Sequence, residues 1–165
     1  MTGEIGFRLA LCPPRNQLEP AGAQEVHAVL EAAGVSGLYP DFDTWYLGRV
    51  APGLRCGERR IFTRRQDGDV IGIAIAKLTA TERKLCTLWV APQARGRGVA
   101  TELARDAFAW LGTARPFFTV PQECVEDFAG LLRSWSFPGP IAYADAYRPA
   151  AVEYAFNGRL GAVNH

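Results

Sequence analysis

The segment that most constrains the fold is VIGIAIA, residues 70–76, because both of its alternating sets of side chains are apolar. Successive side chains of a strand point to opposite faces of the sheet. A sheet with helices on only one face would leave half of these side chains in water. The segment therefore predicts a central strand in a sheet that helices cover on both faces.

Two further strands are predicted beside the central one. Residues 60–65 lead into it through the sequence QDGD, and an Asp-Gly pair between two β-prone runs is a strong hairpin signal. Residues 84–90, KLCTLWV, follow after a short polar connector and are expected to pair with the central strand. These runs predict three neighbouring strands in the middle of the chain.

Helices are predicted where apolar residues recur every three or four positions. Before the strands, this spacing occurs in residues 20–33 and 40–50. After them, it occurs in residues 99–111 and 121–135, and a short strand is predicted between these two helices at residues 117–120. A helix that joins two strands is typical of a crossover connection, so the later half of the chain is expected to contain a β-α-β unit.

Three more strands are expected near the two ends of the chain, at residues 5–11, 141–147 and 152–156. The predicted order is β-α-α-β-β-β-α-β-α-β-β. Hairpins early in the chain and a crossover later predict an α/β (α+β) fold, with a mixed, mostly antiparallel central sheet and helices on both faces. Residues 1–165 are expected to form a single domain, since no repeat, linker or low-complexity segment divides them.

The composition is that of a globular domain in water. Apolar residues make up 48% of the chain and charged residues 21%, and the formal net charge is only +1. These values argue against a broad polyanion-binding surface and leave only a local patch for nucleic acid. The start of the chain lacks the features of a signal peptide, and no run of about 18 apolar residues predicts a membrane span. We therefore expect a cytoplasmic protein without membrane contact.

The cysteines and histidines do not predict a metal site. The four cysteines lie far apart without a C-x-x-C pair, and the chain has only two histidines. Zinc sites are typically built from closely spaced pairs of such ligands. We expect reduced thiols and no bound metal.

The sequence Arg95-Gly96-Arg97-Gly98 joins a predicted strand to a predicted helix, although it favours neither structure. Backbone N–H groups at a helix N-terminus carry partial positive charge and bind phosphate oxygens. Glycine lets such a ligand approach the backbone, and the two arginines can add charge-assisted hydrogen bonds to the same anion. The turn therefore predicts a site for a phosphorylated ligand.

Two common phosphate-binding patterns do not fit this turn. The P-loop pattern needs a lysine, and none lies nearby. The dinucleotide pattern needs a third glycine where Thr101 stands and an acidic residue about 20 positions further, near Phe118. The remaining pattern, Q/R-x-x-G-x-G/A, fits residues 95–100, RGRGVA, and here the chain resembles the GNAT superfamily of N-acetyltransferases.

The resemblance implies that acetyl-coenzyme A is the acyl donor. In that family the turn holds the pyrophosphate, and the preceding strand, here the fourth predicted one at residues 84–90, splays away from its neighbour at residues 117–120. The pantetheine arm then pairs with the opened strand edge like an additional strand. The coenzyme-binding residues implied in this way are Leu88, Trp89, Val90, Arg95, Gly96, Arg97, Gly98, Val99, Ala100 and Thr101.

The catalytic residues of the family do not carry over to this chain. Many members have a glutamate in the strand before the turn, and residues 84–90 contain none. Many also have a tyrosine near the end of the next helix, where Leu132 stands. A base still matters, because an alkylammonium with a pKa near 10.4 loses its proton at pH 7 at a cost of about 4–5 kcal/mol. The general base and acid are left unassigned.

Other residues are candidates for these roles by their expected positions. Tyr143, Tyr147 and Glu153 lie in the predicted C-terminal hairpin, which borders the acceptor pocket in such folds. Glu123 and Cys124 lie at the start of a predicted helix, where a helix N-terminus lowers the pKa of a thiol. Packing or a solvated surface is the simpler interpretation of each.

The early helical region is expected to shape the acceptor side. Asp41 and Asp43 lie beside Trp45 and Tyr46, and acidic and aromatic groups together attract a cationic amine. The simpler alternative is that the aromatic residues form the inward face of a short helix. The basic residues of segment 55–65 are expected to be split between the two faces of a strand, which favours a solvated surface over a nucleic-acid footprint.

The chain is thus predicted to transfer an acetyl group from acetyl-coenzyme A to a primary amine by direct attack in a ternary complex. The acceptor is a small molecule or a macromolecule, and the protein a monomer or a homodimer. Three alternatives stay open: acetylation of aminoacyl-tRNA or a protein in the manner of GNAT toxins, a non-catalytic acyl-coenzyme A-binding module, and a turn that binds another phosphorylated ligand.

Overall fold

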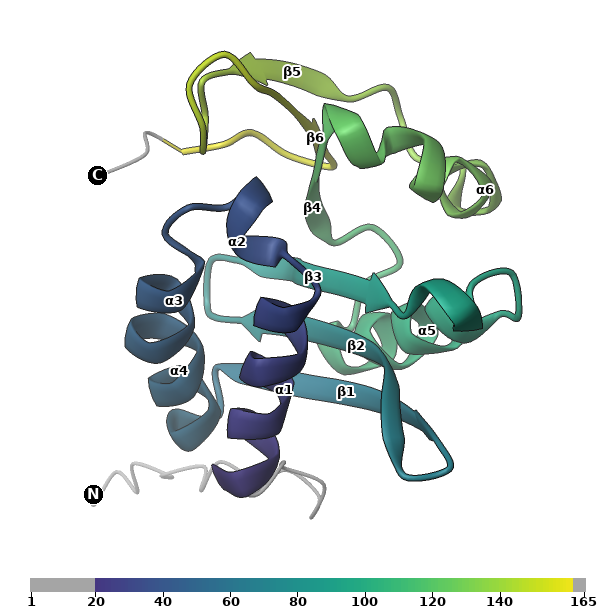
Figure 1. The fold of residues 1–165 in the computed structure, drawn as a ribbon. Coiled ribbons are helices and arrows are strands. Elements are labelled where there is room, and N and C mark those ends of the chain that lie inside the picture. Colours follow the sequence, from purple (N-terminus) through teal and green to yellow (C-terminus); the bar gives the residue numbers. More distant parts are fainter. Residues whose placement is uncertain (1–19, 162–165) are drawn as a thin grey trace, which may run out of the picture.

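A six-stranded sheet in the order β1-β2-β3-β4-β6-β5 organises the computed structural model, which describes residues 20–161 (Figure 1). Neighbouring strands are antiparallel except for β3 and β4, which are parallel. The predicted mixed, mostly antiparallel sheet is therefore confirmed, and the strand predicted at residues 5–11 lies outside the described residues. The strands are β1 (Arg59–Gln66), β2 (Asp69–Leu78), β3 (Arg83–Val90), β4 (Phe117–Pro121), β5 (Ile141–Ala144) and β6 (Val152–Phe156).

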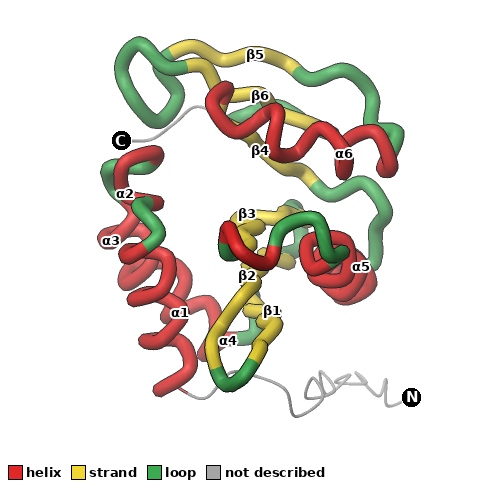
Figure 2. The backbone as a smooth tube through the Cα atoms, turned by 45° about the vertical axis from the view of Figure 1, so that its right-hand side comes forward, coloured by secondary structure: helices red, strands yellow, loops and turns green. Residues whose placement is uncertain are grey.

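Helices cover both faces of the sheet, as predicted. Figure 2 shows α1 and α3 on one side of strands β1 to β3 and α5 on the other. None of the helices in residues 20–161 is long and apolar enough to cross a membrane. The helices are α1 (Pro20–Ala32), α2 (Val35–Leu38), α3 (Phe42–Trp45), α4 (Ala51–Cys56), α5 (Val99–Leu111) and α6 (Val125–Trp135), with a π-helical turn at Tyr46–Val50.

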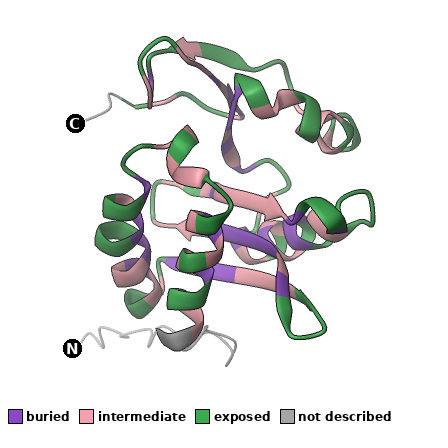
Figure 3. Ribbon diagram, viewed as in Figure 1, coloured by how far each residue is buried: buried purple, intermediate pink, exposed green. Residues whose placement is uncertain are grey.

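The central strand β2 divides the core into two parts. Ile73 and Ile75 pack with side chains of α1 and α3, whereas Ala74 and Ala76 pack with side chains of α5. All four side chains are fully buried, and β2 is buried along most of its length (Figure 3). The apolar character of both alternations in β2 is thus explained by a separate helical cover on each face.

Helix α5 approaches β2 closely because Gly72 has no side chain. A Cβ at this position would lie 2.6 Å from Val99 Cγ1 and 2.8 Å from Leu103 Cδ1. Val99 is the first residue of α5, so this contact also sets the position of the turn before that helix. Gly72 thereby connects the packing of the core to the predicted phosphate site.

The variant Gly72→Ala is expected to lose about 1–3 kcal/mol of unfolding free energy, because the added methyl overpacks the contact with Val99. Denaturant titration measures this loss. The matched control is Gly130→Ala in α6, where an added Cβ meets no atom within 4 Å and helix propensity favours alanine. Equal stability of wild type and Gly72→Ala would contradict the close packing of α5 on β2.

The helix predicted for residues 40–50 extends further in the structure. The chain passes from α3 through the π-helical turn directly into α4, which ends at Cys56. Pro52 lies in the first turn of α4 and has no backbone N–H, so the helical hydrogen bonding is interrupted where the π-helical turn meets α4. The backbone N–H of Ala51 donates to Tyr46 O, five residues back, which is the spacing of a π-helix.

Strand β5 is shorter than predicted, since it ends at Ala144 rather than continuing to residue 147. Asp145 adopts a left-handed backbone conformation with φ 56°, which strands do not use. Its carboxylate accepts a hydrogen bond of 2.6 Å from the backbone N–H of Ala150, so a turn replaces the end of the strand. This turn carries Tyr147 towards the centre of the molecule.

Candidate active site

Strands β3 and β4 separate soon after they meet. They pair only at Lys84 with Phe117 and at Leu85 with Phe118, and the rest of the β3 edge diverges from β4 (Figures 1 and 2). The register with β2 shifts at the same level, because Leu85 and Thr87 oppose consecutive residues of β2 and the residue between them forms a bulge. The predicted splay after the fourth predicted strand is confirmed, and it leaves an unpaired strand edge.

A cavity of about 1400 Å³ occupies this split. One end is lined by the turn before α5, by β3 and by the start of α6; the other end is lined by the segment from α1 to α4 and by the first residues of β1. The cavity thus joins the two faces of the sheet through the opening between β3 and β4. Such a passage lets a ligand from one face meet a ligand from the other.

The glycine-arginine turn has a backbone suited to an anion. Gly96 and Gly98 adopt left-handed conformations with φ 73° and 81°, and a Cβ on either would meet no described atom within 4 Å. The backbone N–H groups of residues 96–101 donate no hydrogen bond to any residue that the structure describes. They lie at the N-terminus of α5, where the helix dipole adds partial positive charge. The turn therefore fits a diphosphate.

Arg95 connects the turn to its surroundings. Its Nε donates to Val90 O at 3.3 Å, and a terminal nitrogen lies 3.6 Å from a carboxylate oxygen of Asp127 in α6. Of the predicted coenzyme-binding residues, all but Arg97 line the cavity. Those that do are Leu88, Trp89, Val90, Arg95, Gly96, Gly98, Val99, Ala100 and Thr101.

Beyond the split, the Tyr39 hydroxyl donates a hydrogen bond of 3.0 Å to Glu153 Oε1. Tyr39 follows α2 and lines the cavity, whereas Glu153 belongs to β6 and is only 4% exposed. The Tyr147 ring packs edge-on against Tyr39, with 5.3 Å between the centroids, and also lines the cavity. A buried carboxyl group thus lies directly behind a cavity-facing phenol.

The surroundings of this pair shift both of its pKa values. Burial raises the pKa of Glu153, and hydrogen bonds from Thr119 and Tyr39, together with the positive charges of Lys84 and Arg148, partly oppose that shift. Burial and the nearby Glu153 charge raise the pKa of Tyr39 well above its usual range, so this phenol stays protonated at neutral pH. The raised pKa makes Glu153 a stronger proton acceptor than an ordinary carboxylate.

Comparison with known proteins agrees with the geometry of the split and the turn. The sequence model of the Acetyltransferase (GNAT) family matches residues 27–120, which is more than half of the 165-residue chain. The chain belongs to the GNAT family of acetyltransferases. No curated protein is significantly similar to it in sequence.

Solved structures share the fold of this GNAT protein at low sequence identity. A protein from Desulfovibrio desulfuricans described as of the GNAT family has 17% identity and a TM-score of 0.63, covering 84% of this chain and 92% of that one. A spermidine N-acetyltransferase chimera derived in part from Vibrio cholerae has 16% identity and a TM-score of 0.59, with the same coverage. An aminoglycoside 6'-N-acetyltransferase complexed with coenzyme A has 12% identity and a TM-score of 0.58, covering 90% and 97%.

The structure corrects the expectation for the Cys124 thiol. Cys124 lines the cavity at the start of α6, but burial and the neighbouring carboxylates of Asp127 and Glu123 raise its pKa instead of lowering it. These effects exceed the influence of the helix N-terminus, because the carboxylates occupy the first turn of the same helical segment. Cys124 is therefore a protonated thiol and a poor nucleophile at neutral pH.

The other catalytic candidates lie in different surroundings. Tyr147 lines the cavity, whereas Glu123 and Tyr143 lie outside its lining. Glu123 forms an exposed ion pair with Arg148, and this hydrogen bond lowers its pKa. Sequence reasoning did not single out Tyr39, because no local pattern marks a residue whose partner lies 114 positions away.

Of the four residues expected on the acceptor side, Asp41 and Trp45 line the cavity. Tyr46 is instead a core residue that is 2% exposed, and its hydroxyl donates to Ala23 O at 2.6 Å. Burial raises the pKa of Tyr46 to about 12. Asp43 faces α1 and lies outside the lining, so the predicted acidic pair is separated.

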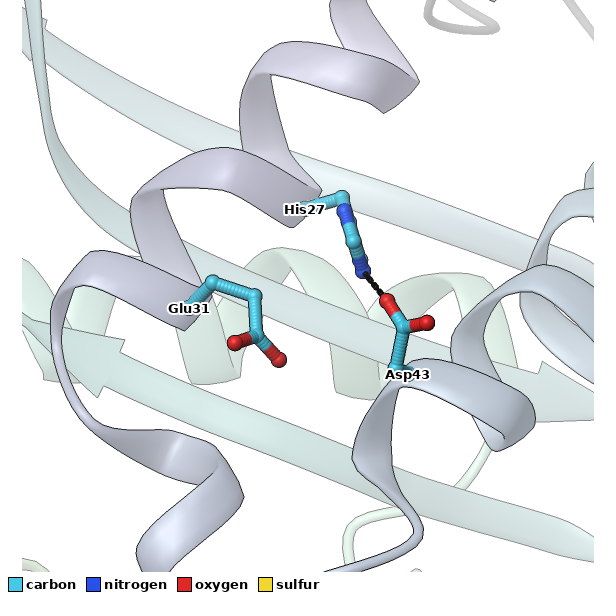
Figure 4. Close-up of side chains that lie close together, drawn as sticks. All are labelled: His27, Glu31 and Asp43. Atoms are coloured by element: carbon cyan, nitrogen blue, oxygen red, sulfur yellow. Dashed lines mark ion pairs between the residues drawn. The ribbon is translucent and has the colours of Figure 1, made fainter.

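His27, Glu31 and Asp43 form a cluster between α1 and α3 that linear spacing did not predict (Figure 4). Their potential ligand atoms lie within 4.8 Å of one another, and His27 is half-buried. His27 Nε2 lies 2.7 Å from Asp43 Oδ1. Bonds to zinc of roughly 2.0–2.2 Å hold ligand atoms further apart than this. We therefore assign the direct contact to a link between the two helices.

The basic residues of segment 55–65 do not form one surface. Arg64 binds Glu102 at 3.1 Å and also Asp106 of α5, and Arg65 binds Glu25 of α1. Arg59, by contrast, is 9% exposed and lines the cavity. The predicted division between the two faces of a strand thus occurs, with Arg59 directed inwards.

Proposed function

We propose that the protein transfers the acetyl group of acetyl-coenzyme A to a primary amine by direct attack within a ternary complex. The observation that carries the proposal is the run of backbone N–H groups at residues 96–101, which donate to no residue that the structure describes and open into the split between β3 and β4. A phosphorylated ligand with an extended arm uses both features, because its phosphates bind the free N–H groups and its arm fits along the open edge of β3. The aminoglycoside acetyltransferase of similar fold is complexed with coenzyme A.

The coenzyme would bind along one end of the cavity. The N–H groups of residues 96–101 would hold the pyrophosphate, and the free edge of β3 at residues 88–90 would pair with the two amides of the pantetheine arm. An N–H group of the same edge would stabilise the negative charge on the thioester oxygen during attack. The acyl group then lies in the split, where an amine from the other end of the cavity reaches it.

Tyr39 and Glu153 would remove the proton from the incoming ammonium group. The ammonium proton moves to Tyr39 Oη while the Tyr39 hydroxyl proton moves to the Glu153 carboxylate, along the hydrogen bond already present. The neutral amine attacks the carbonyl carbon, the C–N bond forms and the C–S bond breaks. The second amine proton leaves with the thiolate as free coenzyme A thiol. No covalent enzyme intermediate is needed, in line with the protonated thiol of Cys124.

The proposal is tested by titrating acetyl-coenzyme A into the protein and by measuring thiol release with a panel of primary amines. We expect saturable binding and thiol release with at least one amine. Binding without release on any amine, on a protein amine or on charged tRNA would show a coenzyme-binding module instead. Absence of binding would refute the assignment of the turn.

We expect kcat/KM to fall on the acidic side of its pH profile at a pH above the usual pKa range of a carboxyl group. Proton transfer requires ionised Glu153, so kcat/KM falls as the pH decreases through the raised pKa of this group. In Tyr39→Phe the carboxylate loses a hydrogen bond that favours its charged form, so its pKa rises further. We therefore expect a lower kcat and an acid limb at higher pH; an unmoved limb would exclude Glu153 as the titrating group.

A further inference from the structure

Arg59 is a buried cation that faces the cavity and forms no ion pair with any residue that the structure describes. Its side chain is 9% exposed, and no carboxylate oxygen of residues 20–161 lies within the 4.0 Å of an ion pair. Arg64 and Arg65, further along β1, both have such partners. Burying an unpaired charge is costly, so a guanidinium that is retained in this position needs a compensating group.

The Arg59 side chain is held in one orientation with part of its hydrogen-bonding edge free. One Nη donates to Cys86 Sγ at 3.2 Å, and the guanidinium carbon lies 5.6 Å from the centre of the Trp45 ring. A Cβ at Gly53 would lie only 2.7 Å from Arg59 Cδ, which shows how closely α4 encloses the aliphatic part. The remaining N–H donors have no acceptor among the described residues.

Arg59 belongs to a row of three cations that crosses the sheet. Arg59 lies opposite Lys77 of β2, and Lys77 lies opposite Lys84 of β3. Directly opposed residues share a face, and like charges in these positions are destabilising. All three line the cavity, on the face that Trp45 of α3 covers.

The acidic groups on this side of the cavity do not neutralise the row. Glu82 forms its ion pair with Lys77, and its charge also interacts at longer range with Lys84 and Arg59. Lys84 stacks over the Phe117 ring at 5.1 Å and interacts electrostatically with Glu153. The remaining charged groups that line this side are Asp41, Arg49 and Glu58, and all three are exposed to solvent. Arg59 is therefore the buried positive charge that a ligand would satisfy.

We infer that the acceptor is a small amine that also carries a carboxylate, of the amino acid class, and that Arg59 binds this carboxylate. A planar guanidinium edge matches a carboxylate in a two-point hydrogen bond, while Trp45 covers its face. The amine of the same molecule extends towards Tyr39, which lines the cavity on the same side of the split. This inference rests on the proposed acetyl transfer, since it names the substrate of that site.

Thiol release with the common L-amino acids and with their carboxamides tests the inference. Each pair differs only in the charge and the hydrogen-bonding groups of one planar end, so we expect kcat/KM to favour the acid by roughly 10- to 100-fold. In Arg59→Met the ratio is expected to fall towards one, and Arg59→Lys should keep part of it, because the charge remains without the planar edge. The matched control is Arg49→Met, an exposed arginine of the same cavity, which should keep the wild-type ratio.

Coenzyme titration and thermal unfolding of each variant separate substrate binding from a loss of structure. If Arg59→Met does not fold, Arg59→Lys supplies the comparison. Equal use of acids and carboxamides by the wild type, or an acid preference that persists in Arg59→Met, would overturn the inference and leave acetyl transfer intact.

Thiol release with neither class, but with another amine of the panel, would overturn the inference and leave acetyl transfer intact. If no amine supports release, the proposed function fails, and direct titration of the same amino acids into the coenzyme-bound protein then decides the inference. Binding that is lost in Arg59→Met supports it. Absence of binding overturns it.

Discussion

Replacement of Glu153 by glutamine is expected to lower kcat by roughly 10²- to 10⁴-fold, the usual contribution of a positioned general base. The amide has the same shape and still offers an oxygen to the Tyr39 hydroxyl, which donates to Glu153 at 3.0 Å. It cannot take up the proton that leaves the acceptor ammonium group. Steady-state thiol release with a saturating amine measures the loss.

The stability of this variant distinguishes a catalytic effect from a structural one. The pKa of Glu153 is raised in the fold, so its contribution to stability is fully present below the pKa of the unfolded chain and is lost as the pH rises through the folded value. Glutamine avoids that loss, and we expect Glu153→Gln to unfold at the same or higher denaturant concentration than wild type at neutral pH.

The matched control for this variant is Glu123→Gln. Glu123 is also a carboxylate near the C-terminal hairpin, but it is exposed and forms its ion pair with Arg148 outside the cavity lining. We expect its kcat to stay at the wild-type value. A Glu153→Gln enzyme with unchanged kcat would remove Glu153 from the mechanism.

Replacement of Gly98 by tryptophan is expected to weaken the binding of acetyl-coenzyme A by about 100-fold or more. The side chain would occupy the open space beside the free N–H groups of residues 96–101, and each charge-assisted hydrogen bond that is lost costs about 1.5–3 kcal/mol. The left-handed conformation of residue 98, with φ 81°, also lowers the stability of the fold by roughly 1–2 kcal/mol, which a control variant with the same strain accounts for. Isothermal titration measures the affinity.

The matched control is Gly57→Trp at the end of α4. Gly57 has φ 80°, and a Cβ there also meets no atom within 4 Å, but the residue lies outside the cavity lining. This variant bears the same backbone strain without obstructing the turn, so its coenzyme affinity should match wild type. Unchanged affinity in Gly98→Trp would refute the pyrophosphate assignment.

Local patterns in the sequence were sufficient to predict most of the strands of the sheet and the helices that pack on its two faces. The two-sided apolar run of β2, the Asp-Gly hairpin before it and the periodicity of α5 depend on neighbours within a few residues. The turn at residues 95–98 is local for the same reason, since left-handed φ values and free helix N-terminal amides follow from glycine and chain direction. The fold class and the position of the turn therefore needed no tertiary information.

The hydrogen bond between Tyr39 and Glu153 and the burial of Arg59 could only be found in the folded chain, although Glu153 was a candidate by its expected position. Tyr39 and Glu153 are 114 positions apart, and neither stands in a pattern that points to the other. The Cys124 thiol shows the same limit, because its raised pKa depends on burial and on which carboxylates surround it. Desolvation and long-range charge arise from packing between distant segments, whereas propensity and periodicity act within one segment. Whether a segment forms a helix or a strand can thus be predicted from its own residues. The chemistry of a side chain depends on the groups that the rest of the molecule places around it.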